Sequence, residues 1–294
     1  MTLSVSLVRT AGKKHFLHAA LRHPNFVIGT TILLVFILLA LLAPYLSSQD
    51  PFSQNLMNRL KPPFWSEGGS LVWPLGTDHL GRDYFSRLLY GCRISLVVGF
   101  GAATLGALIG VTLGVCAAYF GRSVDAAIGY LLSCQLALPN MVLAMTLVFL
   151  IGPSVGVVIA VIGFLHWNYF LVVSRSVSMQ IARLEYVQAS RAAGSSSFQV
   201  IRYDILPNIV QHIIVIFTLE VGLAILAEAS LSFLGVGIPS PMPSWGLMIA
   251  EAKNAIFTSP WLIVLPGLLL FTLVVATNLV GDALRDLISP ETMR

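Results

Sequence analysis

Long uncharged stretches divide the chain into segments that can cross a lipid bilayer. Four stretches contain no Asp, Glu, Lys or Arg, namely 23–49, 94–121, 126–174 and 254–281. A fifth apolar run, 210–236, is interrupted only by Glu220 and Glu228. A transmembrane helix needs about 20 apolar residues, and the longest stretch has the turn signal Gly152-Pro153 near its middle. The pattern therefore predicts six membrane-spanning helices, near 26–46, 95–119, 128–150, 155–174, 210–234 and 261–281.

The composition favours a membrane protein and excludes two other classes. Hydrophobic residues make up 56% of the 294 residues and charged residues only 10%, with a mean hydropathy of +0.85. Soluble domains carry about 25% charged residues, and disordered chains are polar and charged. Backbone groups inside hydrocarbon have no water partner, so the apolar runs must be helical. We therefore expect an all-α, polytopic membrane protein.

Lys and Arg predict the orientation of the chain. Six spans put both termini on one side of the membrane, and that side holds eleven of the 17 Lys and Arg residues. Because positively charged loops stay in the cytoplasm, both termini and the 175–209 loop are expected there. The chain then divides into a cytoplasmic segment 1–25, an uncleaved first helix 26–46, an outer loop 47–92 with a short surface helix near 82–90, a membrane core 93–285 and a cytoplasmic tail 286–294.

The second span carries small residues at every fourth position. They are Ala102, Gly106, Gly110, Gly114 and Ala118. Such a stripe lets another helix approach closely, and that helix can belong to the same chain or to another subunit. The three cysteines and six histidines show no metal-ligand spacing, so no metal site is expected. His166 lies within a span, where an interhelical hydrogen bond is the expected role.

The 185–208 segment predicts two short helices on the cytoplasmic side. The first runs up to Gly194, a residue that commonly ends helices. The second is expected to end before Pro207, because a residue that precedes proline avoids the α conformation. This element can insert into a groove of another protein or lie on the lipid surface, and the pattern alone fits both.

Two carboxylates lie inside the fifth span. Glu220 and Glu228 are separated by about 80° around a helix, so both can face inward. A carboxylate inside a membrane should face the bundle interior or a water-filled path. Glu220 and Glu228 can therefore line a translocation path or hydrogen-bond to a neighbouring helix, and both interpretations remain open.

Several motifs resemble one family. The pattern Gln188-Ala189-Ser190, Gly194 and Leu206-Pro207 is similar to the EAA loop of ABC importer permeases. Segments 75–96, 227–246 and 278–286, together with this loop, resemble the C-type permease subunit of dipeptide, oligopeptide and nickel importers. The resemblance covers residues 26–290. It departs from the family pattern where Gln188 replaces a glutamate, Ser190 an alanine and Asp204 a frequent histidine.

The resemblance implies a type I ABC permease fold in a bacterial plasma (inner) membrane, and a set of partners. These are a second, B-type permease subunit, two ATP-binding subunits and an extracytoplasmic solute-binding protein, with the lipid bilayer around the complex and no nucleic acid. The implied ATPase-docking residues are Gln188, Ala189, Ser190, Arg191, Ala193, Gly194, Leu206 and Pro207.

The energy source must lie in another chain. None of the four lysines of this chain sits in a glycine-rich phosphate loop, so ATP and magnesium are expected on the partner subunits and this chain is not expected to be an enzyme or to bind a cofactor itself. The implied cargo is a di- or oligopeptide, with nickel, glutathione or another small solute as alternatives. A secondary transporter without an ATPase partner is the rival class, but the chain lacks two halves of matching hydropathy.

Overall fold

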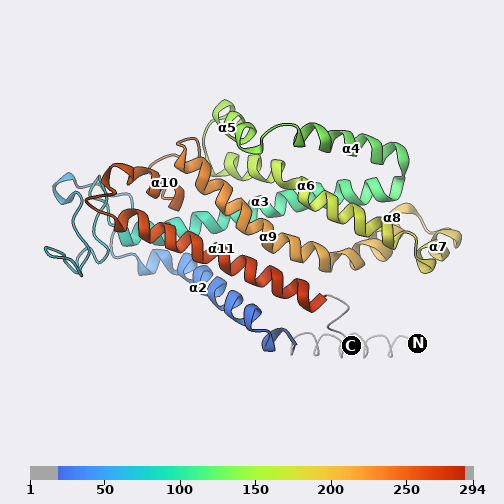
Figure 1. Cartoon of the computed structure of the whole chain (residues 1–294), viewed down its shortest axis with the longest axis horizontal. Coiled ribbons are helices and arrows are strands. Elements are labelled where there is room, and N and C mark those ends of the chain that lie inside the picture. The colour runs from blue at the N-terminus through green and yellow to red at the C-terminus, as the bar shows by residue number, and fades with distance from the viewer. Residues whose placement is uncertain (1–18, 289–294) are drawn as a thin grey trace.

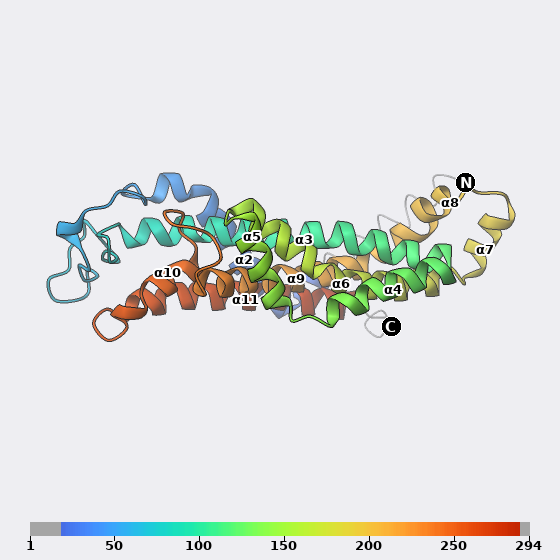
Figure 2. The ribbon, with the colours of Figure 1, turned by 90° about the horizontal axis from the view of Figure 1, so that it is seen from above.

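The computed structural model describes residues 19–288, which form helices and contain no strand. Figures 1 and 2 show an elongated bundle, in which α3 packs against α2, α6 and α9, and α11 packs against α2 and α9. The long helices are α2 (Pro24–Leu46), α3 (Tyr84–Phe120), α6 (Val155–Ile181), α9 (Leu206–Phe233) and α11 (Trp261–Ile288). The shorter ones are α4 (Arg122–Leu136), α5 (Asn140–Ile151), α7 (Glu185–Ala192), α8 (Ser197–Gln199) and α10 (Trp245–Glu251). Most of the predicted segments 1–25 and 286–294 lies outside the described residues.

Five of the six predicted spans coincide with helices that are long and apolar enough to cross a membrane. The prediction that the sixth span is one continuous helix over 128–150 is wrong. This span is the pair α4 and α5, which are bent by 86° relative to each other. The break falls at Pro139, which lacks an amide hydrogen and disfavours the α conformation of the residue before it. The predicted turn at Gly152-Pro153 separates α5 from α6 and is confirmed.

The stripe of small residues on α3 packs against α6 of the same chain. A Cβ atom on Gly110 would collide with the carbonyl oxygen of Trp167, and one on Gly114 would collide with Ser174. On the facing side, a Cβ on Gly163 would lie 2.9 Å from the carbonyl oxygen of Ala102. The two backbones are therefore in direct contact, and the question of which subunit the stripe faces is settled in favour of an intramolecular contact.

We expect Gly110→Ala to destabilise the protein by about 1–3 kcal/mol, because the added methyl group overpacks a backbone contact that cannot yield without separating the helices. Thermal unfolding in detergent measures the effect. Gly129→Ala in α4 is the matched control, because no atom lies within 4 Å of the added carbon there. Equal melting temperatures for the two variants would contradict the close α3–α6 contact.

Residues 84–90 belong to α3 and do not form the separate surface helix that was predicted near 82–90. Asp83 begins this helix, since its Oδ2 accepts a hydrogen bond of 2.8 Å from the amide of Ser86. Burial raises the pKa of the Asp83 carboxyl, and the bonds to Ser86 partly oppose that rise. The loop that precedes α3 therefore ends at residue 83, and the 37-residue helix α3 projects toward it beyond the apolar stretch.

Four charged residues form a buried network where the 47–83 loop meets α10. Arg82 places Nε 2.6 Å from Asp78 Oδ2 and a terminal nitrogen 2.9 Å from Glu251 Oε2. Arg87 bridges the same two carboxylates, at 3.3 Å from Asp78 and 3.0 Å from Glu251. Both arginine side chains are fully buried. Two acids and two bases thus neutralise one another and join the loop, the start of α3 and the end of α10.

A buried tryptophan completes this junction. Trp245 of α10 donates its indole N–H to the carbonyl oxygen of Leu88 over 3.1 Å, and its ring packs edge-on against Phe36 at a centroid distance of 5.9 Å. The apolar core around it also contains Tyr84 and Leu262. Helices α2, α3, α10 and α11 therefore form one packed body at this end of the bundle.

Candidate functional site

The 185–208 loop forms one tip of the molecule, at the end opposite α10 and the 47–83 loop (Figures 1 and 2). Helix α7 ends at Ala192, and Gly194 has a φ of +87°, a conformation that a residue with a Cβ atom rarely adopts. The next helix begins at a capping box, in which Ser196 and Gln199 exchange hydrogen bonds. The prediction that two helices meet at Gly194 is thus confirmed.

The second helix does not end before Pro207, and that prediction is wrong. Helix α8 continues through a π-helical segment, Val200–Ile205, directly into α9. Pro207 lies in the first turn of α9, where its missing amide hydrogen removes no bond of the α-helical ladder. The wider π turn accommodates the proline ring, so the loop is rigidly joined to a membrane helix.

One side chain anchors α7 to the bundle. Val187 is completely buried, in an apolar cluster with Val115 of α3, Ile181 of α6, and Val200, Ile205 and Ile209 of the π segment and α9. Arg191 adds a second contact, because its guanidinium lies 4.3 Å from the centre of the Tyr119 ring at the end of α3. A force on α7 would therefore reach α3, α6 and α9 together.

Most of the predicted docking residues lie at the exposed tip, and two do not. Gln188, Ala189, Arg191, Ala193 and Gly194 are exposed, and Ser190 is half-buried with its hydroxyl 3.2 Å from that of Ser195. Leu206 and Pro207 lie at the base of α9. The tip also presents Phe198 and Tyr203, which are 72% and 70% exposed. The sequence analysis did not single out these two residues, whose aromatic character is their only signal in the sequence.

The two carboxylates of α9 have different surroundings. Glu220 is buried, and its Oε2 lies 2.9 Å from Nδ1 of His166 on α6. Glu228 is also buried, accepts a 2.7 Å hydrogen bond from the hydroxyl of Ser232, and has no partner for Oε2 among the described residues. The expected interhelical bond of His166 is confirmed, with Glu220 as the partner that sequence reasoning did not identify.

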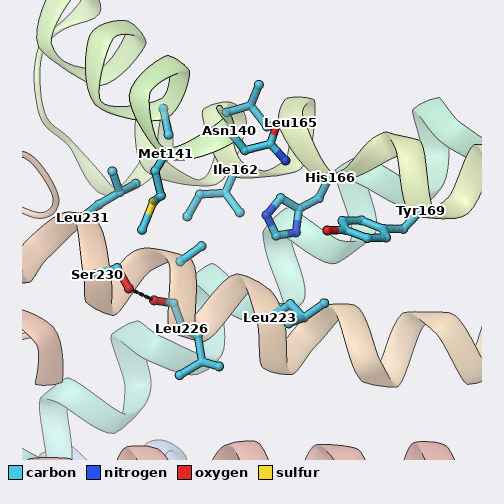
Figure 3. Close-up of a pocket in the computed structure, with 12 residues that line it drawn as sticks. Asn140, Met141, Ile162, Leu165, His166, Tyr169, Leu223, Leu226, Ser230 and Leu231 are labelled. Atoms are coloured by element: carbon cyan, nitrogen blue, oxygen red, sulfur yellow. Dashed lines mark hydrogen bonds between the residues drawn. The ribbon is translucent and has the colours of Figure 1, made fainter. Parts of the chain in front are cut away.

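A pocket lies beside the His166–Glu220 pair, between α5, α6 and α9 (Figure 3). Its volume is about 300 Å³. His166 and Tyr169 project from α6 into this space, and the tyrosine hydroxyl is turned toward the imidazole (Figure 3). The remaining lining is mostly apolar, with Asn140 of α5 and Ser230 of α9 as further polar residues. Neither Glu220 nor Glu228 is among the lining residues, but Glu220 is bonded to His166, which is one of them.

One group of side chains in the described part of the chain has the spacing of metal ligands. Asp78, His79 and Glu251 have ligand atoms within 4.8 Å of one another. Both carboxylates are already paired with Arg82 and Arg87. A cation would have to displace those guanidinium groups, so these residues are better explained as a closed ion-pair network.

Two family comparisons match this architecture. Residues 94–294 match the family described as "Binding-protein-dependent transport system inner membrane component". The chain belongs to this family. Residues 14–63 match the "N-terminal TM domain of oligopeptide transport permease C". Together the matches confirm the resemblance to ABC importer permeases of the C type, which rested on the 185–208 loop and three further segments.

Individual relatives extend the comparison over nearly the whole permease. The dipeptide transport system permease protein DppC of Haemophilus influenzae is 37% identical over 90% of each chain. The glutathione transport system permease protein GsiD of Pectobacterium atrosepticum is 34% identical, over 97% of this chain and 92% of the relative. A chain of the MetNI methionine ABC transporter aligns with a TM-score of 0.57 at 15% identity, over 69% of this permease and 97% of that chain. The last likeness confirms the type I permease fold.

Proposed function

We propose that this permease forms half of the translocation pathway of an ATP-driven peptide importer. The observation that carries the proposal is the projecting 185–208 loop, which is anchored in the bundle by Val187 and ends in exposed side chains. The names of the relatives support a peptide as the cargo, since the DppC proteins belong to dipeptide systems. Glutathione, itself a small peptide, is the second candidate because a glutathione-system permease is 34% identical.

The partners follow from what this chain lacks. It has no phosphate-binding loop, so ATP and magnesium bind to two separate ATPase subunits. A B-type permease forms the other half of the pathway, and a solute-binding protein delivers the peptide from outside. The distribution of Lys and Arg supports a cytoplasmic position for both termini and for the 185–208 loop.

The geometry suggests how ATP hydrolysis moves the bundle. Closure of the ATPases pushes on α7, whose buried Val187 lies in one apolar cluster with residues of three membrane helices. The rigid connection from α8 through the π segment to α9 carries the same motion into the helix that holds Glu220. The bundle then changes between inward-open and outward-open states as a rigid-body movement of packed helices.

Docking of the ATPase is tested by removing an exposed apolar side chain from the tip. We expect Phe198→Ser to lower the amount of ATPase that co-purifies with the permease by at least about tenfold, since buried aromatic residues dominate protein interfaces. Phe257→Ser is the matched control, because Phe257 is 97% exposed at the opposite end of the molecule. Undiminished recovery of the ATPase with Phe198→Ser, or equal losses with both variants, would contradict docking at this tip.

A further inference from the structure

We infer that the pocket between α5, α6 and α9 binds the N-terminal residue of the transported peptide, with its α-ammonium group beside the His166–Glu220 pair and its apolar side chain among the leucines of α9. This inference rests on the proposed function, because it assigns a place on the pathway to the peptide cargo. It adds a binding site and a preference for the first residue.

The pair is suited to bind a cation. Nδ1 of His166 lies 2.9 Å from the Glu220 carboxylate, so a neutral imidazole that donates to this acid has its hydrogen on Nδ1. Nε2 then becomes a hydrogen-bond acceptor, and no hydrogen bond within the described residues uses it. A neutral imidazole bonded to a carboxylate has a net charge of −1. A carboxylate held inside the membrane-spanning part of the bundle favours a positively charged ligand over a neutral one.

Tyr169 provides a second element of recognition. Its ring lies 5.8 Å from the His166 ring in an edge-to-face arrangement, and both side chains line the pocket. An ammonium group between the imidazole and this residue would also be close to the tyrosine hydroxyl, whose oxygen can accept a hydrogen bond. The imidazole and the tyrosine therefore lie together at one end of the pocket (Figure 3), and the Glu220 carboxylate is bonded to that imidazole.

The rest of the pocket fits an apolar side chain. Leu223, Leu226 and Ala227 of α9 face Ile162 and Leu165 of α6 across it. A volume of about 300 Å³ is at the lower end of the range for ligand pockets, so it accommodates one large side chain and its backbone but not a long peptide. The charge lies at one end and the apolar surface beyond it, which is the arrangement of a free amino terminus and its first side chain.

The test measures equilibrium binding of radiolabelled dipeptides to the purified complex of both permeases and both ATPases, without the binding protein. The probes are Leu-Gly, Gly-Leu and N-acetyl-Leu-Gly. We expect Leu-Gly to bind at least about tenfold more tightly than the other two, since a pocket discriminates by about that factor for each lost favourable group. Glu220→Gln should abolish the difference between Leu-Gly and its acetylated form while leaving the difference between Leu-Gly and Gly-Leu.

A second variant tests the apolar part of the pocket. Ala227→Phe fills the space with a larger side chain, so we expect it to remove the preference for Leu-Gly over Gly-Leu. Ile214→Phe is the control on the same helix, because Ile214 is 46% exposed and is not a lining residue. A purely structural effect of either pocket variant would weaken all three probes equally and leave their ratios unchanged, which would overturn the inference.

The remaining outcomes separate this inference from the proposed function. Equal binding of Leu-Gly and N-acetyl-Leu-Gly to the unaltered complex would show that the pocket is an apolar cavity that does not recognise the ammonium group. That result would overturn the inference. Absence of binding would also overturn it. In either case ATP-dependent uptake of dipeptides by the complete transporter would still support the proposed function, whereas loss of that uptake in the unaltered transporter would contradict the proposed function itself.

Discussion

Replacing Glu251 with alanine is expected to destabilise the permease by about 3–5 kcal/mol, because the change leaves two buried arginines with a single carboxylate partner. Arg82 and Arg87 are both fully buried, and water cannot compensate the lost charge. The loop 47–83, the start of α3 and the end of α10 should separate as a result. Thermal unfolding in detergent, together with the yield of folded protein from membranes, measures the effect.

Two further variants make this prediction specific to the buried charge. Glu67→Ala is the matched control, since Glu67 is an exposed acid in the 47–83 loop. The double variant Glu251→Met with Arg82→Met restores neutrality with apolar side chains, so it should be more stable than Glu251→Ala alone. The prediction fails if Glu251→Ala melts at the same temperature as the Glu67→Ala control.

Replacing Gly194 with valine is expected to uncouple ATP hydrolysis from uptake. The φ of +87° at this position costs a residue with a Cβ atom about 1–2 kcal/mol, and a β-branched residue is less tolerant still. No atom lies within 4 Å of an added Cβ, so the effect comes from the backbone alone. A changed angle between α7 and α8 should lower peptide uptake by about tenfold or more while the protein still inserts and ATP is still hydrolysed.

A second variant, Gly194→Asn, distinguishes an effect of the altered backbone conformation from an effect of losing glycine as such. Asn tolerates the left-handed conformation better than other residues, so Gly194→Asn should retain most of the coupling. Uptake and ATP hydrolysis are measured together in reconstituted vesicles that contain the complete transporter. Normal coupling in Gly194→Val, or an equal defect in both variants, would refute the role of this turn.

The membrane helices were predictable because each is specified by its own residues. The apolar runs predict α2, α3, α6, α9 and α11, since a helix in hydrocarbon satisfies its backbone internally and needs no partner to form. Two of the errors fall where the effect of a proline depends on its context. Pro139 breaks a span whose hydrophobicity alone predicts one continuous helix. Pro207, in contrast, lies inside a continuous helix, because the π turn before it makes room for the proline ring.

The candidate site was predictable only in part. Gly194 and the exposed residues of α7 follow from local signals, because helix stops and motif residues are adjacent in the chain. Phe198 and Tyr203 carry no such signal except their aromatic character. Glu220 was identified as a costly carboxylate inside a span, but its partner His166 is 54 residues away and belongs to another helix.

Composition and short-range pattern thus suffice to establish the membrane class, the helical content and the projecting loop, because these depend on hydrophobicity and on neighbouring residues. Which helix the α3 stripe contacts, which carboxylate neutralises Arg82 and Arg87, and where the pocket beside His166 opens depend on segments far apart in the chain. Such contacts arise from packing in three dimensions. Many pairings are compatible with the same local pattern, and only the folded arrangement selects one of them.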